Sequence, residues 1–276
     1  MLAAVAAVVL LAGCTADHPR ASTTTVTTAV PPTTLGAVDT FHLRTPGVLV
    51  VGTEEMNPPW YIGGGPDTVT SGFEHDLAEA LATDLQVPRV RFVQVPLVDL
   101  LSGEDCGCDL MLTQALVTEE RAKAVDFTEP YLNVGEAALV RTSAPFASLV
   151  GARSLQWALP LRDTAAGDIL RRVVQPLDPP QTVVNVDEGV RRLEAGEIDA
   201  LMVDTPTALS LAAGDTSLTV VGQFHTDQQY AGVLPLGSPN TALVDDAIRA
   251  ERARGTLDTL ARIYFGTVPA DVPLIQ

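Results

Sequence analysis

The sequence predicts an α/β protein built on a parallel or mixed sheet, and two recurring patterns lead to this prediction. Short continuous apolar runs, of which residues 48–51 are the first, are typical of strands covered on both faces. Between such runs lie segments such as residues 74–85, in which Leu77, Leu81 and Leu85 recur at helical spacing. Strands that alternate with helices along a chain favour a parallel or mixed sheet.

The remaining elements follow in order. Thr118 has a side chain that suits a helix N-cap, and the two glutamates after it are well placed in the first turn of a short helix. A Gly at 196 ends an amphipathic helix that starts at Asp187. The other predicted elements are strands at 90–95, 109–112, 137–140 and 198–203, and two C-terminal helices capped by Asn240 and Thr256.

The first residues have the pattern of a targeting segment. Residues 2–12 form an uncharged apolar run, and a membrane-spanning helix needs about 20 residues, so residues 1–13 are predicted to be a signal peptide. The run ends in Leu-Ala-Gly before Cys14, which resembles a bacterial lipobox with Cys14 as the lipidation site. The alternative is an ordinary apolar N-terminus that happens to contain a cysteine.

Residues 14–44 are predicted to be a tether. Thr and Pro recur there with almost no large apolar side chains, so the segment cannot offset its ordering entropy by burial. Lipid on Cys14 would place the body at the cell surface, anchored to the outer face of the cytoplasmic membrane.

The composition excludes several classes of partner and cofactor. The 34 acidic and 17 basic residues give a net charge of −17, which would repel nucleic acids. Four scattered histidines and three cysteines give no metal-ligand spacing, so neither a metal nor a cofactor is predicted. Outside the membrane, Cys106 and Cys108 could form a small bridge or pair with another thiol.

Short motifs follow one another through residues 46–266 in a fixed order: Val-Val-Gly-Thr-Glu at 50–54, Gly-Phe-Glu-His-Asp-Leu-Ala at 72–78, Cys-Asp-Leu-Met at 108–111, Thr-Glu-Glu-Arg at 118–121, Asp-Phe-Thr-Glu-Pro-Tyr at 126–131, Gly-Glu-Ile-Asp-Ala at 196–200, Asp-Thr-Pro at 204–206 and Ile-Tyr-Phe-Gly at 263–266. The ordered set resembles family 3 of the bacterial extracellular solute-binding proteins, which capture polar amino acids for import. The resemblance implies the two-lobe periplasmic-binding-protein type II fold, with the ligand in a cleft between lobes joined by two crossover strands. It places the first lobe at 45–136 and 234–276, and the second at 137–233.

The resemblance also implies a ligand site divided between the lobes. Arg121 occupies the family's carboxylate-binding position, and its planar guanidinium can grip both carboxylate oxygens. Asp204, at a strand end, matches the acid that holds the ligand's ammonium. On the residues alone, Arg121 is a surface arginine and Asp204 a helix N-cap, a role it could combine with binding.

Further ligand-binding positions follow from the same resemblance. Glu54 stands where relatives often carry a second acid near the ammonium. Thr113, Gln114 and Leu116 follow a strand where the family binds the ligand carboxylate, although Leu116 replaces the usual hydroxyl. Asn57 replaces a clamping aromatic, which favours polar contacts with the ligand side chain.

In the second lobe, residues 160–164 align with the family's ligand-facing loop. This loop adds Arg162 and Thr164 to the predicted site, and Arg162 would reach an acidic ligand side chain.

The function predicted from these features is that of a monomeric lipoprotein, not an enzyme, which delivers a polar amino acid to an ABC-type permease and ATPase. A sensor that signals to a membrane receptor is an alternative that the sequence does not separate from it. A dehydratase-like enzyme on the same fold, with Glu54 and Glu55 as acid or base, is a third class. The chain has no Gly-x-Ser-x-Gly elbow, metal motif or phosphate loop, which favours binding.

Overall fold

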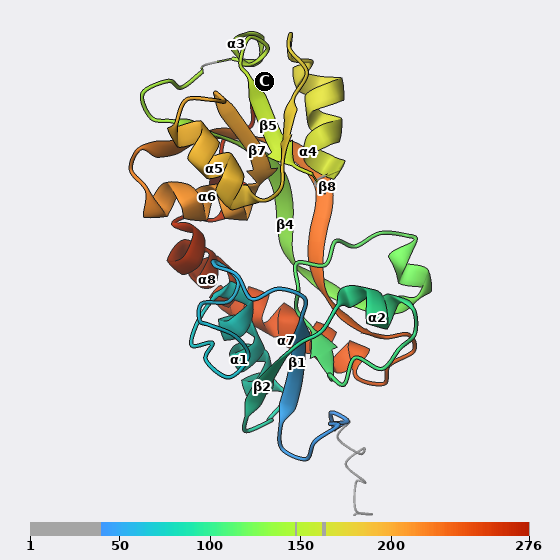
Figure 1. Ribbon diagram of the computed structural model, residues 1–276. Helices are drawn as coiled ribbons and strands as arrows, with labels where there is room; N and C mark the ends of the chain where they lie inside the picture. Colours follow the sequence, from blue (N-terminus) through green and yellow to red (C-terminus); the bar gives the residue numbers. More distant parts are fainter. Residues whose placement is uncertain (1–39, 147, 162–163, 276) are drawn as a thin grey trace, which may run out of the picture. The chain divides into compact units, whose positions relative to one another are not determined.

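The computed structural model describes residues 40–146, 148–161 and 164–275 (Figure 1). The predicted signal peptide, Cys14, most of the predicted tether and Arg162 lie outside the described residues. The strands are β1 (Leu49–Thr53), β2 (Val90–Gln94), β3 (Leu110–Met111), β4 (Val125–Arg141), β5 (Trp157–Pro160), β6 (Gln181–Val183), β7 (Ala200–Asp204) and β8 (Leu218–Pro235).

The α-helices are α1 (Phe73–Asp84), α2 (Leu97–Leu101), α3 (Leu149–Ala152), α4 (Thr164–Ile169), α5 (Val186–Glu194), α6 (Thr205–Gly214), α7 (Thr241–Arg254) and α8 (Thr256–Phe265). Shorter turns of other helical types are η1 (Arg121–Lys123), η2 (Leu170–Val174) and η3 (Pro269–Asp271).

One mixed sheet of eight strands, in the order β2-β1-β3-β8-β4-β7-β5-β6, runs through the described body and confirms the predicted α/β class. β1 pairs in parallel with β2 and β3, and β5 pairs in parallel with β6 and β7. Between these two sets, β4 and β8 pair antiparallel along most of their length, and Figure 1 shows them side by side. They are the two crossover strands of the predicted fold.

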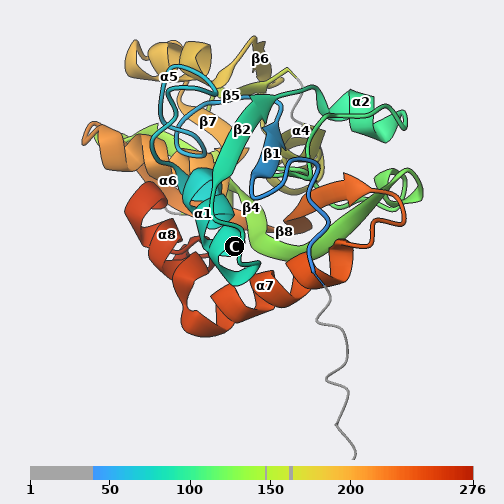
Figure 2. The same cartoon turned by 90° about the horizontal axis from the view of Figure 1, so that it is seen from below.

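Each parallel set has its own covering helices and its own apolar cores. In the first lobe, α1, α7 and α8 contact one another (Figure 2), and their apolar faces bury Leu77, Ile248 and Phe265 against β1. In the second lobe, Trp157 and Met202 of the sheet pack with Leu170 in a separate core. Burial of such side chains stabilises each lobe by roughly 1.5–3 kcal/mol per large side chain.

The C-terminal residues return to the sheet beside the second lobe. The side-chain amide of the buried Gln223 in β8 donates to the carbonyls of Pro269 and Val272, at 2.8 and 2.9 Å. Ile275 donates its backbone N–H to the carbonyl of Gln223 at 2.9 Å.

The residue boundaries between the two lobes, which come from the family resemblance, stay predictions.

Backbone geometry fixes where α1 begins. Gly72 precedes the helix with φ of 131°, and a Cβ at this position would lie 2.2 Å from the carbonyl oxygen of Trp60. Only glycine allows this approach. Phe73 can therefore enter the core at the first turn of α1, where its ring stacks on Phe265 at 4.9 Å between centroids.

Two capping predictions are corrected at the C-terminal helices. Asn240 does precede α7, but its side chain makes no cap bond; it accepts from the backbone N–H of His42 and donates to the carbonyl of His42. Thr256 is the first residue of α8, and Gly255 is its N-cap. The side chain of Asn240 therefore joins α7 to the residues before β1 instead of capping the helix. Sequence spacing does not reveal this contact, because its partner is distant in the chain.

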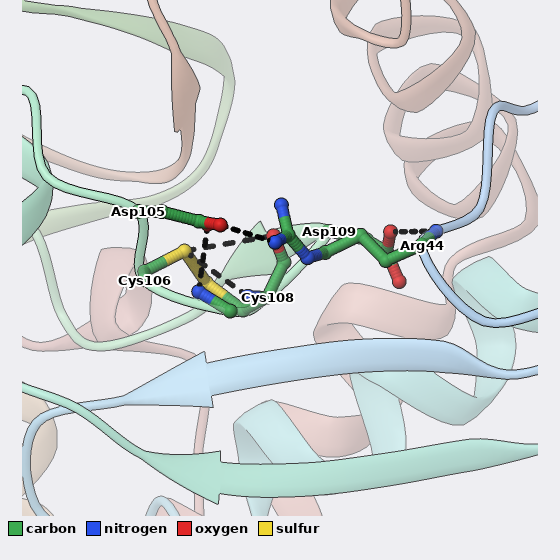
Figure 3. Close-up of polar contacts among 6 residues, drawn as sticks. Arg44, Asp105, Cys106, Cys108 and Asp109 are labelled. Atoms are coloured by element: carbon green, nitrogen blue, oxygen red, sulfur yellow. Dashed lines mark hydrogen bonds and ion pairs between the residues drawn. A yellow bond between two sulfur atoms is a disulfide. The ribbon is translucent and has the colours of Figure 1, made fainter.

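A buried carboxylate attaches the residues before β1 to the sheet (Figure 3). Asp109 is 5% exposed and accepts from the backbone N–H groups of Arg44 and Val50, at 2.7 and 2.8 Å. The Arg44 guanidinium also bonds to the exposed Asp105, next to a disulfide between Cys106 and Cys108. Of the two pairings left open for these cysteines, the structure has the mutual bridge.

Substitution of Asp109 tests this attachment. Asp109→Ala leaves the N–H of the fully buried Val50 without its acceptor, so the free energy of unfolding should fall by about 1–3 kcal/mol in urea denaturation. Asp105→Ala is the matched control, because it removes a neighbouring carboxylate from an exposed ion pair worth about 1 kcal/mol or less. Equal losses for both variants would contradict the role given to Asp109.

Candidate functional site

A cleft of about 670 Å³ is lined by residues from both lobes. Its size is within the usual range for small-molecule sites, about 300–1,000 Å³. The lining residues come from the loop after β1, the loop after β3, the start of α5, the β7–α6 junction and β8: Glu55, Asn57, Pro58, Pro59, Trp60, Gln114, Asn185, Val186, Asp187, Asp204, Thr207, Ser210, Leu211 and Tyr230. Ligand sites of α/β sheets commonly form at such strand ends.

Three of the predicted site residues lie together in this cleft, namely Asp204, Gln114 and Asn57. Asp204 ends β7, and its carboxylate accepts from the backbone N–H of Thr207 at 3.0 Å, so it caps α6 as well as lining the cleft. Asn57 donates its side-chain amide to the carboxylate of Glu55 at 2.7 Å. Two lobes therefore contribute polar groups to one space.

The other predicted residues of the first lobe do not line this cleft. Thr113 accepts from the backbone N–H of Glu54 at 2.8 Å, which joins the ends of β3 and β1. Leu116 forms a backbone bridge with the cleft residue Tyr230. Arg121, in η1, donates from Nη1 to the carbonyl of Leu116 at 3.2 Å.

The predicted first turn after Thr118 is present in a shortened form. The hydroxyl of Thr118 accepts from the backbone N–H of Arg121 at 3.2 Å, but the turn that follows is the 3₁₀ turn η1 instead of an α-helix. In the second lobe, Thr164 begins α4, while its predicted neighbour Arg162 lies outside the described residues.

Several cleft residues escaped the sequence analysis. Asn185 and Asp187 follow β6, so the rule that ligands sit beyond strand ends could have found them. Tyr230 lies within the long strand β8, which no periodic signal revealed. Trp60 is not one of these, because the sequence predicts it as a residue of the core or of the cleft wall. It lines the cleft and is also buried, with its ring edge-on to Phe73, Tyr230 and Phe265.

The charge of the cleft lining is negative. Glu55, Asp187 and Asp204 contribute carboxylates, and no Lys or Arg stands among the described residues that line it. Such a lining attracts a cationic group such as an ammonium and repels an additional anion.

Buried polar side chains form hydrogen bonds with the loop after β3. Tyr61 donates its hydroxyl to the carbonyl of Leu112 at 2.8 Å. Glu74, with 0% exposure, accepts from the backbone N–H of Gln114 at 2.8 Å and also from its side-chain amide and from the hydroxyl of Tyr131. Burial raises the pKa of Glu74 to about 7, against the opposing effect of these hydrogen bonds.

Neither a metal centre nor a membrane span is found in the described part of the chain. Its His, Cys, Asp and Glu side chains form no group of three or more that could hold a metal ion. None of its helices combines the length and apolar character needed to cross a bilayer.

Comparisons with known proteins agree with this architecture. The L-cystine-binding protein TcyJ of Escherichia coli is 30% identical over 232 residues, which cover 80% of this chain and 83% of TcyJ. Among solved structures, an ancestral cationic amino acid solute-binding protein (AncCDT-1) matches with a TM-score of 0.68 and 26% identity, over 79% of this chain and 96% of that one.

A second solved structure is an amino acid ABC transporter substrate-binding protein from Streptococcus pneumoniae, bound to L-arginine. It matches with a TM-score of 0.64 and 25% identity, over 80% of this chain and 95% of that chain. The sequence profile of the bacterial extracellular solute-binding proteins, family 3, matches residues 49–267. The chain is therefore a member of family 3 of the bacterial extracellular solute-binding proteins.

Proposed function

We propose that this protein captures a polar amino acid in the cleft between its lobes and delivers it to an ABC-type membrane permease. The observation that carries the proposal is the cleft itself, in which Asn57 and Gln114 of the first lobe face Asp187 and Asp204 of the second. The names of the relatives support the ligand class, since they bind L-cystine or L-arginine.

A free amino acid supplies two opposite charges for the two ends of this site. Its ammonium group suits the carboxylate of Asp204, with Glu55 and Asp187 adding to the negative potential. Arg121 is the group proposed for the ligand carboxylate. Its guanidinium has five N–H donors, of which the bond to Leu116 uses one, and turning it toward the cleft would provide a bidentate grip.

Ligand capture is proposed to favour a closed arrangement of the lobes. A ligand shifts the population only by as much as it binds the closed form more tightly than the open one. Contacts that one amino acid makes with both lobes exist only in the closed form, so they provide this difference.

The lipid anchor on Cys14, the signal peptide, the monomeric state and the position outside the cytoplasmic membrane belong to the same proposal. Partnership with a membrane receptor is the alternative to a permease, and crosslinking followed by identification of the captured membrane protein distinguishes the two.

An enzymatic alternative has one specific observation in its favour. The structural neighbour AncCDT-1, an ancestral amino-acid-binding protein, is described as a precursor of cyclohexadienyl dehydratase; one of its structures matches with a TM-score of 0.61 and 26% identity. Turnover of cyclic amino-acid precursors by the purified chain, followed by product analysis, would establish that alternative in place of capture.

The ligand class is tested by a thermal-shift screen of the twenty amino acids and L-cystine with the full chain. We expect a polar amino acid to raise the melting temperature, because binding to the native state alone stabilises it by about 2.7 kcal/mol at 100 times Kd. L-aspartate and L-glutamate should give smaller shifts than L-arginine, since the lining carboxylates repel a further negative charge. This order is the opposite of the one that contact between Arg162 and an acidic ligand side chain would favour, so the screen decides between the two expectations. Absence of any shift would count against amino-acid capture.

Asp204→Asn tests the ammonium site. Asparagine keeps a good helix N-cap, so the fold should be preserved, while the counter-charge is lost. The Kd from calorimetry should rise by roughly 30-fold or more, corresponding to about 2 kcal/mol. Asp178→Asn, an exposed acid of the same lobe, serves as the control and should leave the Kd unchanged.

Arg121→Ala tests the carboxylate site. Without the guanidinium, the ligand carboxylate would be enclosed without a charged partner, so affinity should fall by a factor of about 100 or more. Lys123→Ala removes a positive charge from the same turn at an exposed position and is the matched control. An unchanged Kd for Arg121→Ala would remove Arg121 from the site.

A further inference from the structure

Gln114 stands out in the cleft lining by its backbone conformation. Its φ of +47° lies in the left-handed region, which residues other than glycine rarely adopt. A strained conformation persists only where the surroundings determine it. The backbone N–H of Gln114 donates to Glu74, the second residue of α1, forty positions earlier in the chain.

Glu74 accepts hydrogen bonds from both the backbone and the side chain of Gln114. One carboxylate oxygen accepts from the backbone N–H at 2.8 Å, and the other accepts from the side-chain amide nitrogen. The amide is thereby fixed in one of its two possible flips, with its nitrogen toward Glu74. Because Gln114 lines the cleft, the orientation of this polar group at the site depends on a carboxylate beneath it.

We propose that Glu74 is a positioning residue of the cleft, which sets the conformation of Gln114 and thereby tunes ligand affinity without touching the ligand. The tuning of affinity rests on the proposed function, whereas the control over Gln114 does not.

Among the described residues, the groups that act on Glu74 are hydrogen-bond donors, and none of them is a Lys or an Arg. Tyr131 of β4 donates its hydroxyl to the same carboxylate, and Tyr61, from the loop before α1, has its pKa raised by burial and by the charge of Glu74. Tyr230 of β8 contributes to the raised pKa of Tyr131 and is not among the groups that act on Glu74. The groups that act on Glu74 are therefore neutral donors, which favour its ionised form, while burial favours its protonated form.

Protonation of Glu74 weakens its hydrogen bonds to Gln114. Hydrogen bonds to an ionised carboxylate are roughly twice as strong as those to a neutral one. With a pKa of about 7, Glu74 is mostly ionised at pH 8 and mostly protonated at pH 6. The hold on Gln114 should weaken as the pH falls across this range, and ligand affinity should weaken with it.

A purely structural role for Glu74 makes a different prediction. An acid in the first turn of a helix stabilises that helix through its dipole. Loss of such a role would lower the melting temperature, but it would leave the pH profile of binding and the state of Gln114 unchanged.

The test compares the full chain with Glu74→Gln and with Glu251→Gln. Glu251 is the matched control, because it is also buried, at 4% exposure, but it pairs with Arg254 in α7. L-arginine, L-glutamine and L-cystine are titrated calorimetrically at pH 8 and pH 6. For each probe that binds the wild type, we expect Kd to rise by about 3- to 10-fold between pH 8 and pH 6.

In Glu74→Gln, the Kd at pH 8 should be about tenfold higher and its change between pH 8 and pH 6 should disappear, whereas Glu251→Gln should follow the wild type. The same Kd for wild type and Glu74→Gln at both pH values would overturn the proposed effect on affinity.

A ligand-free readout separates this inference from the proposed function. In NMR spectra without any amino acid, the backbone and side-chain amide signals of Gln114 should move with a single midpoint near pH 7 in the wild type, and not in Glu74→Gln. Failure of all three probes to bind the wild type would count against amino-acid capture alone. Gln114 signals that ignore both pH and the substitution would overturn the positioning role itself.

Discussion

β4 and β8 pair antiparallel from Val125 with Pro235 to Arg141 with Leu218, and the other strands attach to this ladder on either side. β8 receives β3 of the first lobe and β4 receives β7 of the second. The ladder is irregular between Val134 and Glu136 of β4, where residues 225–227 of β8 are inserted. A Cβ on the intervening Gly135 would lie 2.6 Å from the side chain of Gln223, so close approach requires glycine there.

The cleft follows from this arrangement, because it collects the strand ends that the ladder brings opposite each other. β1 and β3 supply Asn57 and Gln114 from one side, and β6 and β7 supply Asp187 and Asp204 from the other. Hydrogen bonds within the protein fix these polar groups. The backbone N–H of Thr207 donates to the carboxylate of Asp204, and the backbone N–H of Gln114 donates to Glu74. Such preorganisation lowers the entropic cost of binding, since fewer groups must be ordered by the ligand.

Sequence patterns predicted the parts of the protein that depend on local periodicity and on ordered motifs. The first strand, α1, β2 and β7 lie within a few residues of their predicted positions, and Asp204 lies at a strand end beside a cleft. Residues 125–136 of β4 and all of β8 were not predicted, because their burial is irregular and their partners are distant in sequence. Glu74 was noticed only as part of a motif, since its contact with Gln114 spans forty residues.

Closure of the lobes on an amino acid is tested most directly by pulsed electron paramagnetic resonance between spin labels on the two lobes. Labels at Glu79→Cys on α1 and Glu194→Cys on α5, both at exposed positions, with Cys14 replaced by serine, report the distance across the cleft. Saturation with L-arginine, L-glutamine or L-cystine should shorten the mean distance for at least one of them. A distance distribution that none of the three changes would contradict capture by closure.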